Sequence, residues 1–244
     1  ATGRRFGAER DTLLVSVRSG AARSMPGMME TVLNLGLNDR TVRALAERTG
    51  NARFAFDAYR RFLGAYGSVV FRLPRDPIDQ FLRDAKARSG ATQDTEVPAE
   101  ALEEICGRIQ AHIKESIGRP FPQDAGEQLG GAIEAVFKSW MAEKAVTYRR
   151  VERISGLPGT AVSVVQMVFG NLGETSGSGV CFTRDPNTGE KALYGDVLMN
   201  AQGEDVVAGV RTPMTIEKTQ RRLPAVYKEL QRVRVTLERH YRDL

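Results

Sequence analysis

The feature that most constrains the fold is a change of sequence pattern at Gly156-Leu157-Pro158-Gly159. From residue 38 to residue 150, apolar residues recur mainly at three- and four-residue steps, which is typical of amphipathic helices. Thr160 to Phe169 (TAVSVVQMVF), directly after the change, and Thr12 to Arg18 (TLLVSVR), near the start, have the composition of strands. The order β, mostly α, β and a final helix predicts an α+β fold with a helical insertion.

Within this order, helices are expected from Asn38 or Asp39 to Arg48, around Phe54 to Leu63, and over Ile78–Ala87, Pro98–Ile117 and Gln128–Arg150. The last of these is expected to bury Ile133, Val136, Phe137 and Trp140. Strands are expected over Thr160–Phe169, Val180–Thr183, Ala192–Met199 and Asp205–Ala208. A final amphipathic helix, Arg222–Leu244, has an apolar stripe of Leu223, Val226, Tyr227, Leu230, Val233, Leu237, Tyr241 and Leu244.

Composition excludes several classes of protein. The 244 residues carry 35 Lys+Arg against 30 Asp+Glu, and this net charge of +5 is too small and dispersed to indicate nucleic-acid binding. No apolar run approaches the roughly 20 residues of a membrane helix. The two cysteines, Cys106 and Cys181, are expected to be buried packing residues rather than a disulfide scaffold. They and the lack of a signal peptide predict a cytoplasmic protein, and two histidines leave no His-rich metal site.

The segment from Val17 to Met28 has the composition of a phosphate cradle. Arg18 lies at the end of the first predicted strand, and an arginine fork can bind a phosphate through two donors. The small residues that follow allow backbone N–H groups to approach an anion. No Gly-Lys-Ser/Thr follows, so this is not a Walker motif. A surface hairpin with a salt-bridged arginine is the alternative interpretation.

Two further segments have the composition of a nucleotide site. Gln166 to Gly170 ends a strand in a glycine loop, which suits the apolar slot and backbone hydrogen bonds of an adenine, although an ordinary core strand has the same pattern. Glu204 and Asp205 would point to opposite faces of a strand, so they are poor joint metal ligands. One of them could accept hydrogen bonds from a ribose, and a turn with two solvated charges is the alternative.

Taken together, these segments resemble the pyruvate phosphate dikinase family. The matching blocks recur in order over almost the whole chain: VSVRSGAARSMPGMMETVLNLGLND (Val15 to Asp39), NARFAFDAYRRF (Asn51 to Phe62), FPQDAGEQLGGAIEAVFKSW (Phe121 to Trp140), SGSGVCFTRDPNTGE (Ser176 to Glu190) and NAQGEDVVAGVRTP (Asn200 to Pro213). The related phosphoenolpyruvate synthases have an Arg-Ser-Ser-Ala-type segment instead of the first block's Arg-Ser-Gly.

The resemblance implies an ATP-grasp nucleotide-binding region. Residues 1–37 and 123–168 would form part of one subdomain, residues 38–122 a helical insertion, and residues 169–244 part of the second subdomain. The family converts ATP, phosphate and pyruvate to AMP, pyrophosphate and phosphoenolpyruvate through a phosphohistidine. In this scheme ATP gives its β-phosphoryl to a histidine on another domain of the same full-length chain, and phosphate accepts the γ-phosphoryl. The full-length protein is expected to be a homodimer.

The family's site residues carry over to matching positions of this sequence. Arg18 would be the catalytic arginine that binds the triphosphate, under a loop formed by Met25, Pro26, Gly27 and Met28. The adenine would be lined by Gln166, Met167 and Val168. The second subdomain would contact the nucleotide through Ser178, Gly179, Glu204 and Asp205.

The chain also departs from the family pattern. A phosphate-contacting lysine and the Asp-x-Glu-Phe and Gln-Thr-Arg strands that hold Mg²⁺ are missing, so the chain is expected to be a fragment truncated at both ends. Such a fragment would be inactive, with weak or no ATP affinity. Two alternatives stay open: a phosphotransferase of the phosphoenolpyruvate synthase type, and a non-catalytic helical interaction module over Asn38–Arg150. The enzyme interpretation would be favoured if Arg18 and Gly27 line a cleft that faces the strand-rich part of the chain after Gly159.

Overall fold

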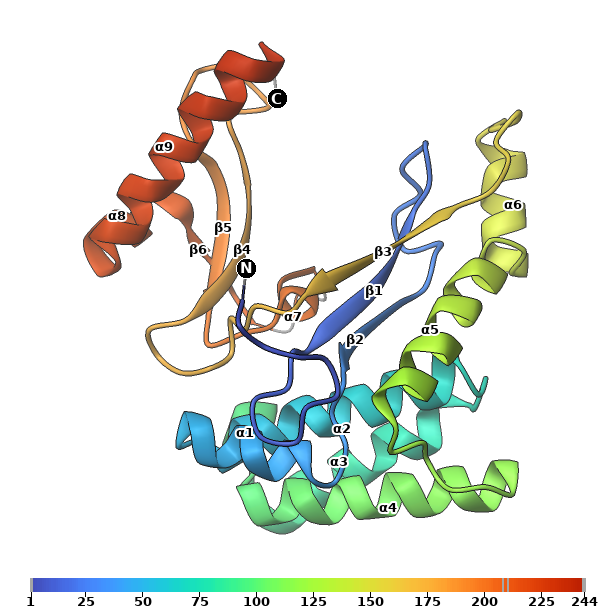
Figure 1. Ribbon diagram of the computed structural model, residues 1–244. Coiled ribbons are helices and arrows are strands. Elements are labelled where there is room, and N and C mark those ends of the chain that lie inside the picture. The colour runs from blue at the N-terminus through green and yellow to red at the C-terminus, as the bar shows by residue number, and fades with distance from the viewer. Residues whose placement is uncertain (1, 208, 210, 243–244) are drawn as a thin grey trace. The chain divides into compact units, whose positions relative to one another are not determined.

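A computed structural model describes residues 2–207, 209 and 211–242. The chain divides into two compact units, Ala1–Met167 and Val168–Leu244, and each unit has its own antiparallel sheet (Figure 1). Helices and two small antiparallel sheets together confirm the predicted α+β class.

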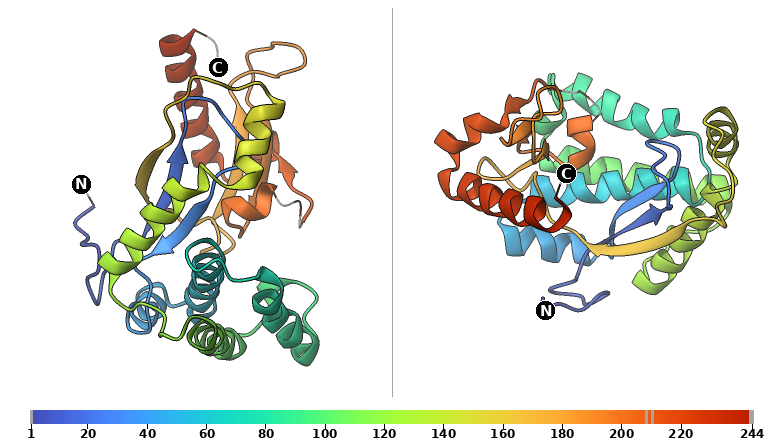
Figure 2. Two further views of the ribbon diagram at one scale, coloured as in Figure 1. Left: turned by 90° about the vertical axis from the view of Figure 1, so that its right-hand side faces the viewer. Right: turned by 90° about the horizontal axis from the view of Figure 1, so that it is seen from above.

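The first unit is built on the sheet β2-β1-β3. Its strands are β1 (Val15–Gly20), β2 (Thr31–Leu35) and β3 (Ala161–Gln166). The β1–β3 ladder is regular over all its pairs, whereas the β1–β2 ladder has a bulge in β2 at Asn34, whose φ is +64°. Helix α5 (Ala125–Ser139) packs against all three strands (Figure 2), and Val17 and Val32 are fully buried in the core of this unit.

Between β2 and β3 the chain is helical. The helices are α1 (Thr41–Thr49), α2 (Ala52–Val69), α3 (Arg75–Ser89), the short 3-10 helix η1 (Asp94–Glu96), α4 (Ala99–Ile117), α5 and α6 (Glu143–Val151). Helix α2 is central and packs against α1, α3, α4, α5 and β2. Its buried Tyr59, Phe62 and Tyr66 meet Phe121 edge-on, with ring centroids 6.5, 5.6 and 5.3 Å apart, which is a favourable aromatic geometry.

Capping residues mark several of the predicted helix ends. Helix α1 begins at Thr41 after its N-cap Arg40, later than the predicted cap at Asn38 or Asp39, although the Asn38 side-chain oxygen accepts a hydrogen bond from the Thr41 N–H at 2.8 Å. Helix α4 begins directly after Pro98 and ends at the left-handed Gly118, one residue from the predicted bounds. Helix α3 begins at Arg75 rather than Ile78, because Pro77 falls in its first turn, where no backbone N–H is needed.

The prediction of a single helix over Gln128–Arg150 is wrong, because two helices, α5 and α6, occupy this stretch. At the end of α5 the backbone tightens into i→i+3 hydrogen bonds, such as Met141 N–H to Lys138 O at 3.0 Å. The hydroxyl of Ser139 also bonds to the Val136 carbonyl at 2.7 Å and so competes with the helical ladder. Val136 is buried as predicted, whereas Phe137 is 49% exposed and lies on the outer side.

The described residues of the second unit form the sheet β4-β5-β6 and three helices. The strands are β4 (Gly177–Phe182), β5 (Tyr194–Met199) and β6 (Met214–Thr215), and the helices are α7 (Gly203–Val207), α8 (Ile216–Arg222) and α9 (Pro224–Tyr241). The reverse turn predicted at Asp185–Gly189 is confirmed by the Gly189 N–H to Asp185 O bond of 2.8 Å. Glu238 on α9 is bound by the Arg184 guanidinium at 2.7 Å, which fastens α9 to this turn.

Two predictions for the second unit are wrong. Asp205–Ala208 is not a strand, because residues up to Val207 form α7, and Ala208 lies outside the described residues. The reason is a local cap: the Asp205 carboxylate accepts the Gln202 N–H at 3.0 Å and so initiates a helical turn. Cys181 is exposed on β4 rather than buried, whereas Cys106 on α4 is buried as predicted.

The predicted final helix Arg222–Leu244 corresponds to α9, which begins at Pro224, because Leu223 separates it from Arg222, the last residue of α8. Pro224 disfavours helical backbone at the preceding residue, and Leu223 accordingly has φ −137°. Of the predicted apolar stripe, Val226, Val233 and Tyr241 are exposed, the other described members are half-buried, and Leu244 lies outside the described residues. No helix in the described part of the chain is both long and apolar enough to cross a membrane.

Candidate functional site

Arg18 projects from the sheet of the first unit. Val15, Ser16 and Val17 are buried in β1, and the exposed Arg18 follows them. Its Nε–H donates to the Ser16 hydroxyl at 3.3 Å. Among the described residues none forms an ion pair with Arg18, so the salt-bridged arginine of the alternative interpretation is not observed. The Nη groups of the guanidinium are therefore available to an anion.

The loop after β1 is anchored by one methionine and exposes the residues beside it. Met28 N–H donates to the Met25 carbonyl at 3.1 Å and closes a four-residue turn. Pro26 in the second position and Gly27 with φ +72° in the third follow the type II pattern. Met25 is 7% exposed, whereas Pro26 and Gly27 are exposed, and a Cβ on Gly27 would meet no atom within 4 Å. The turn thus presents its glycine backbone to solvent.

The base of this loop is tied to the junction of α5 and α6. Glu30 N–H donates to the Ser139 hydroxyl at 3.3 Å, and the Glu30 carboxylate pairs with Lys144 at 2.6 Å. The loop is therefore held at both ends, by β1 before it and by these contacts after it.

The predicted nucleobase residues lie at the end of β3. Gln166 is paired with Val15, three residues along β1 from Arg18, which corresponds to about 10 Å. Met167 N–H continues the ladder by donating to the Leu14 carbonyl at 2.9 Å. Val168, the first residue of the second unit, is 86% exposed. Two residues after the end of β3, the chain therefore exposes an apolar side chain that is available to a ligand.

In the second unit the structure brings Ser178 next to the segment that leads to Glu204 and Asp205. The Ser178 hydroxyl donates to the Ala201 carbonyl at 2.8 Å, and Ala201 N–H donates to the Gly170 carbonyl at 2.9 Å. Helix α7, which carries both carboxylates, packs against β4. The hydroxyl proton of Ser178 is therefore used inside the protein, and the hydroxyl can only accept from a ligand.

Glu204 and Asp205 do not have the geometry expected of a strand. On α7 successive side chains are about 100° apart rather than on opposite faces. Asp205 uses one carboxylate oxygen for the Gln202 cap, whereas Glu204 is exposed. The described residues contain no group of three or more His, Cys, Asp or Glu side chains that could hold a metal ion.

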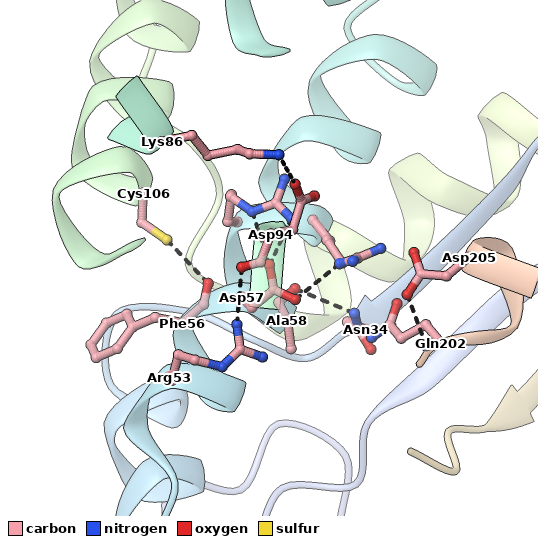
Figure 3. Close-up of polar contacts among 12 residues, drawn as sticks. Asn34, Arg53, Phe56, Asp57, Ala58, Lys86, Asp94, Cys106, Gln202 and Asp205 are labelled. Atoms are coloured by element: carbon pink, nitrogen blue, oxygen red, sulfur yellow. Dashed lines mark hydrogen bonds and ion pairs between the residues drawn. The ribbon is translucent and has the colours of Figure 1, made fainter. Parts of the chain in front are cut away.

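The sequence analysis missed a buried charge cluster on α2. Asp57 is 4% exposed and pairs with Arg60 at 2.6 Å and Arg61 at 3.0 Å, and Figure 3 shows its polar surroundings. Burial raises the pKa of Asp57, but the two guanidiniums outweigh burial and lower it to about 2. One carboxylate thus pairs with two arginines. Their spacing of three and four residues after Asp57 is the helical spacing of ion pairs, so the sequence contained a signal for this cluster.

Comparison with known proteins places this chain in a family. The family described as "Pyruvate phosphate dikinase, AMP/ATP-binding domain" matches residues 1–243. The chain is 51% identical over 243 residues to the pyruvate, phosphate dikinase of Clostridium symbiosum, covering 99% of this chain and 28% of that protein. It is 52% identical over 255 residues to that of Rhizobium meliloti (strain 1021), covering 100% and 28%. It is 52% identical over 232 residues to the chloroplastic pyruvate, phosphate dikinase 1 of Arabidopsis thaliana, covering 95% and 24%.

The chain spans about a quarter of the length of these curated relatives. The family match extends over both units, and the alignment with the Clostridium symbiosum protein covers 99% of this chain. This chain therefore belongs to the pyruvate phosphate dikinase AMP/ATP-binding domain family.

Proposed function

We propose that this chain binds ATP as part of a pyruvate phosphate dikinase, and that ATP gives its β-phosphoryl to a histidine on another domain of the same protein. The observation that carries the proposal is the exposed guanidinium of Arg18, which has no ion-pair partner among the described residues. A side chain of this kind can bind two phosphate oxygens at once. Inorganic phosphate would accept the γ-phosphoryl, and the full protein would use the phosphohistidine to make phosphoenolpyruvate from pyruvate.

Arg18 and the residues at and after the end of β3 would contact different parts of the ligand. Arg18 neutralises charge on the triphosphate, and the exposed backbone of the turn Met25–Met28 covers the phosphates. Gln166, Met167 and Val168 line the adenine, about 10 Å along the ladder from Arg18. This spacing along one sheet separates the two ends of the ligand. Phosphoryl transfer needs mainly such positioning and charge neutralisation, since little covalent work is required of the protein.

The residues of the second unit complete the proposal. Gly179 approaches the nucleotide through its backbone, and the Ser178 hydroxyl accepts rather than donates, because its proton is already used. Glu204 and Asp205 on α7 accept hydrogen bonds at the ribose and phosphate end. Residues 1–37 and 123–168 would form one subdomain, residues 38–122 the helical insertion and residues 169–244 the second subdomain. We further propose a cytoplasmic homodimer for the full-length protein.

The described residues contain no group of three or more His, Cys, Asp or Glu side chains that could hold a metal ion. Mg²⁺ commonly binds through substrate phosphates and few carboxylates. We therefore assign no step to a protein-held metal and treat Mg²⁺ as the counter-ion that accompanies ATP.

The test is calorimetric titration of this chain with a non-hydrolysable ATP analogue and Mg²⁺. We expect weak, measurable binding that Arg18→Ala reduces by about tenfold or more, which corresponds to 1.4 kcal/mol. The matched control is Arg75→Ala on α3, since Arg75 is also exposed, 67% in its side chain, and lies outside the proposed site. Absence of binding by the wild-type chain, or equal losses in the two variants, would contradict the proposal.

A further inference from the structure

A buried hydroxyl lies beside the exposed arginine of the proposed site. Ser16 is 2% exposed and precedes Arg18 by two residues in β1. Alternate residues of a strand share one face, and the β1–β3 ladder is regular through both positions, so the two side chains point to the same side of the sheet. Arg18 Nε lies 3.3 Å from Ser16 Oγ, within hydrogen-bonding distance.

The single proton of Ser16 fixes the direction of this contact. Ser16 Oγ donates to the Val165 carbonyl on β3 at 3.4 Å, so its lone pairs accept the Arg18 Nε–H. The chain of hydrogen bonds therefore runs from Arg18 through Ser16 to Val165. It occupies one guanidinium N–H and leaves the four N–H groups on the Nη atoms as a fork.

We propose that Ser16 is a positioning residue that orients the Arg18 guanidinium for the ATP phosphates. This inference rests on the proposed function. A free arginine side chain has many rotamers and must lose them on binding, whereas a guanidinium already held at Nε loses fewer. The acceptor Ser16 is itself buried, so the hydroxyl end of this bond is removed from competing water, whereas the Arg18 side chain is exposed.

The same hydroxyl connects the phosphate end of the site to the base end. Val165, which accepts from Ser16, directly precedes Gln166–Val168, the proposed adenine residues. Loss of the hydroxyl would therefore loosen Arg18 relative to the strand that holds the base. Its effect should depend on the number of phosphates in the ligand, because AMP lacks the phosphates that Arg18 is proposed to bind.

The experiment is an NMR titration of this chain and its variants with AMP and with a non-hydrolysable ATP analogue and Mg²⁺. Ser16→Ala should weaken binding of the ATP analogue by about fivefold, the effect of one hydrogen bond, and leave AMP affinity unchanged. Ser16→Thr keeps the hydroxyl and should restore most of the affinity. In the Arg18→Ala background, Ser16→Ala should have no further effect, because the two residues act as one unit.

The matched control is Thr41→Ala. Thr41 is also 2% exposed, and its hydroxyl donates to the Gly36 carbonyl at 2.9 Å, away from Arg18. This change should lower the free energy of unfolding without altering the ratio of ATP-analogue to AMP affinity. If Thr41→Ala changes the ratio as much as Ser16→Ala, stability rather than positioning explains the effect and the proposal is overturned.

A second readout does not depend on the ligand. The NMR resonance of the Arg18 Nε–H is assigned as the one that disappears in Arg18→Lys. This proton should exchange with water more slowly in the wild-type chain than in Ser16→Ala. Equal exchange rates would overturn the positioning role even if ATP binds. Wild-type binding that Ser16→Ala leaves unchanged would overturn the positioning role alone, whereas no wild-type binding of either nucleotide would overturn the proposed function as well.

Discussion

Replacing Asp57 by asparagine should strongly destabilise the first unit. The Asp57 carboxylate is 4% exposed and is the counter-charge for Arg60 and Arg61, which are 13% and 17% exposed. Asparagine has nearly the same shape but no charge, so the variant removes the negative charge that faces both guanidiniums. Such a change removes little packing and isolates the electrostatic contribution.

The magnitude follows from the pKa of Asp57. Its fall from 3.8 to about 2 is nearly two units, and at about 1.4 kcal/mol per unit the folded state favours the charged carboxylate by about 2 kcal/mol. Asparagine also offers one acceptor oxygen where the carboxylate offers two. Breaking a buried ion pair by removing one partner costs roughly 3 to 5 kcal/mol in other proteins. We therefore expect a loss of about 2 to 4 kcal/mol at pH 7.

The sign of the pH dependence is set by the lowered pKa. A carboxylate whose pKa is lower in the folded state than in the unfolded state stabilises the fold fully at any pH above its unfolded-state pKa. This stabilisation disappears as the pH falls through the folded-state pKa. For Asp57 this window runs from about 3.8 down to about 2. The difference in stability between the wild-type chain and Asp57→Asn should therefore be constant from pH 7 to pH 5 and shrink below pH 4.

The assay is urea unfolding followed by the fluorescence of Trp140. The chain has one tryptophan, and it lies at the end of α5, so its signal reports the first unit. The control is Glu103→Gln, because Glu103 pairs with Arg43 at the surface with its side chain 44% exposed, and such pairs contribute at most about 1 kcal/mol. Equal stability of Asp57→Asn and the wild-type chain at pH 7 would refute the reasoning, as would a difference that persists unchanged into acid.

Two glycines give contrasting predictions. Gly27→Ala should lower the free energy of unfolding by about 1 kcal/mol, because φ is +72° although no atom lies within 4 Å of the new Cβ. Gly27→Asn should lower it by less, since asparagine tolerates this backbone conformation. Equal losses of the two variants in urea unfolding would contradict this prediction. Gly170→Ala should be far more damaging to the second unit, because its Cβ would lie inside the contact distance of the Ser178 hydroxyl and the Ala201 carbonyl. Amide hydrogen exchange of β4 and β5 should show this loss of protection, and an unchanged pattern would show that the loop shifts freely.

The elements that sequence predicted best are those with local signals at both ends. Helix α4 is framed by Pro98 and Gly118 and has an unbroken apolar row, so periodicity and caps agree. The break between α5 and α6 has neither proline nor glycine, and the apolar pattern continues through it. It arises from a tight turn at Ser139–Ala142, which a search for periodicity cannot detect.

In the candidate site, too, only the features with a local sequence signal could be predicted. The exposure of Arg18 after three buried residues depends on β1 and its sheet, and the strand itself was predicted. The partner of Ser16 could not be predicted, because Val165 lies 149 residues away and only the strand register brings them together. Asp57 was within reach of sequence reasoning, since its arginines follow at helical spacing on a helix that was predicted.

Serine hydroxyls have the same role in both units. Ser16 on β1 donates to Val165, and Ser178 on β4 donates to Ala201, each joining a strand to a separate segment that leads to proposed ligand residues. Val165 precedes Gln166, and Ala201 precedes the cap of α7 with Glu204 and Asp205. Both bonds form within one unit, so each half of the proposed site is ordered by its own contacts. A ligand would then find its binding groups already oriented in each unit, which reduces the ordering cost of binding.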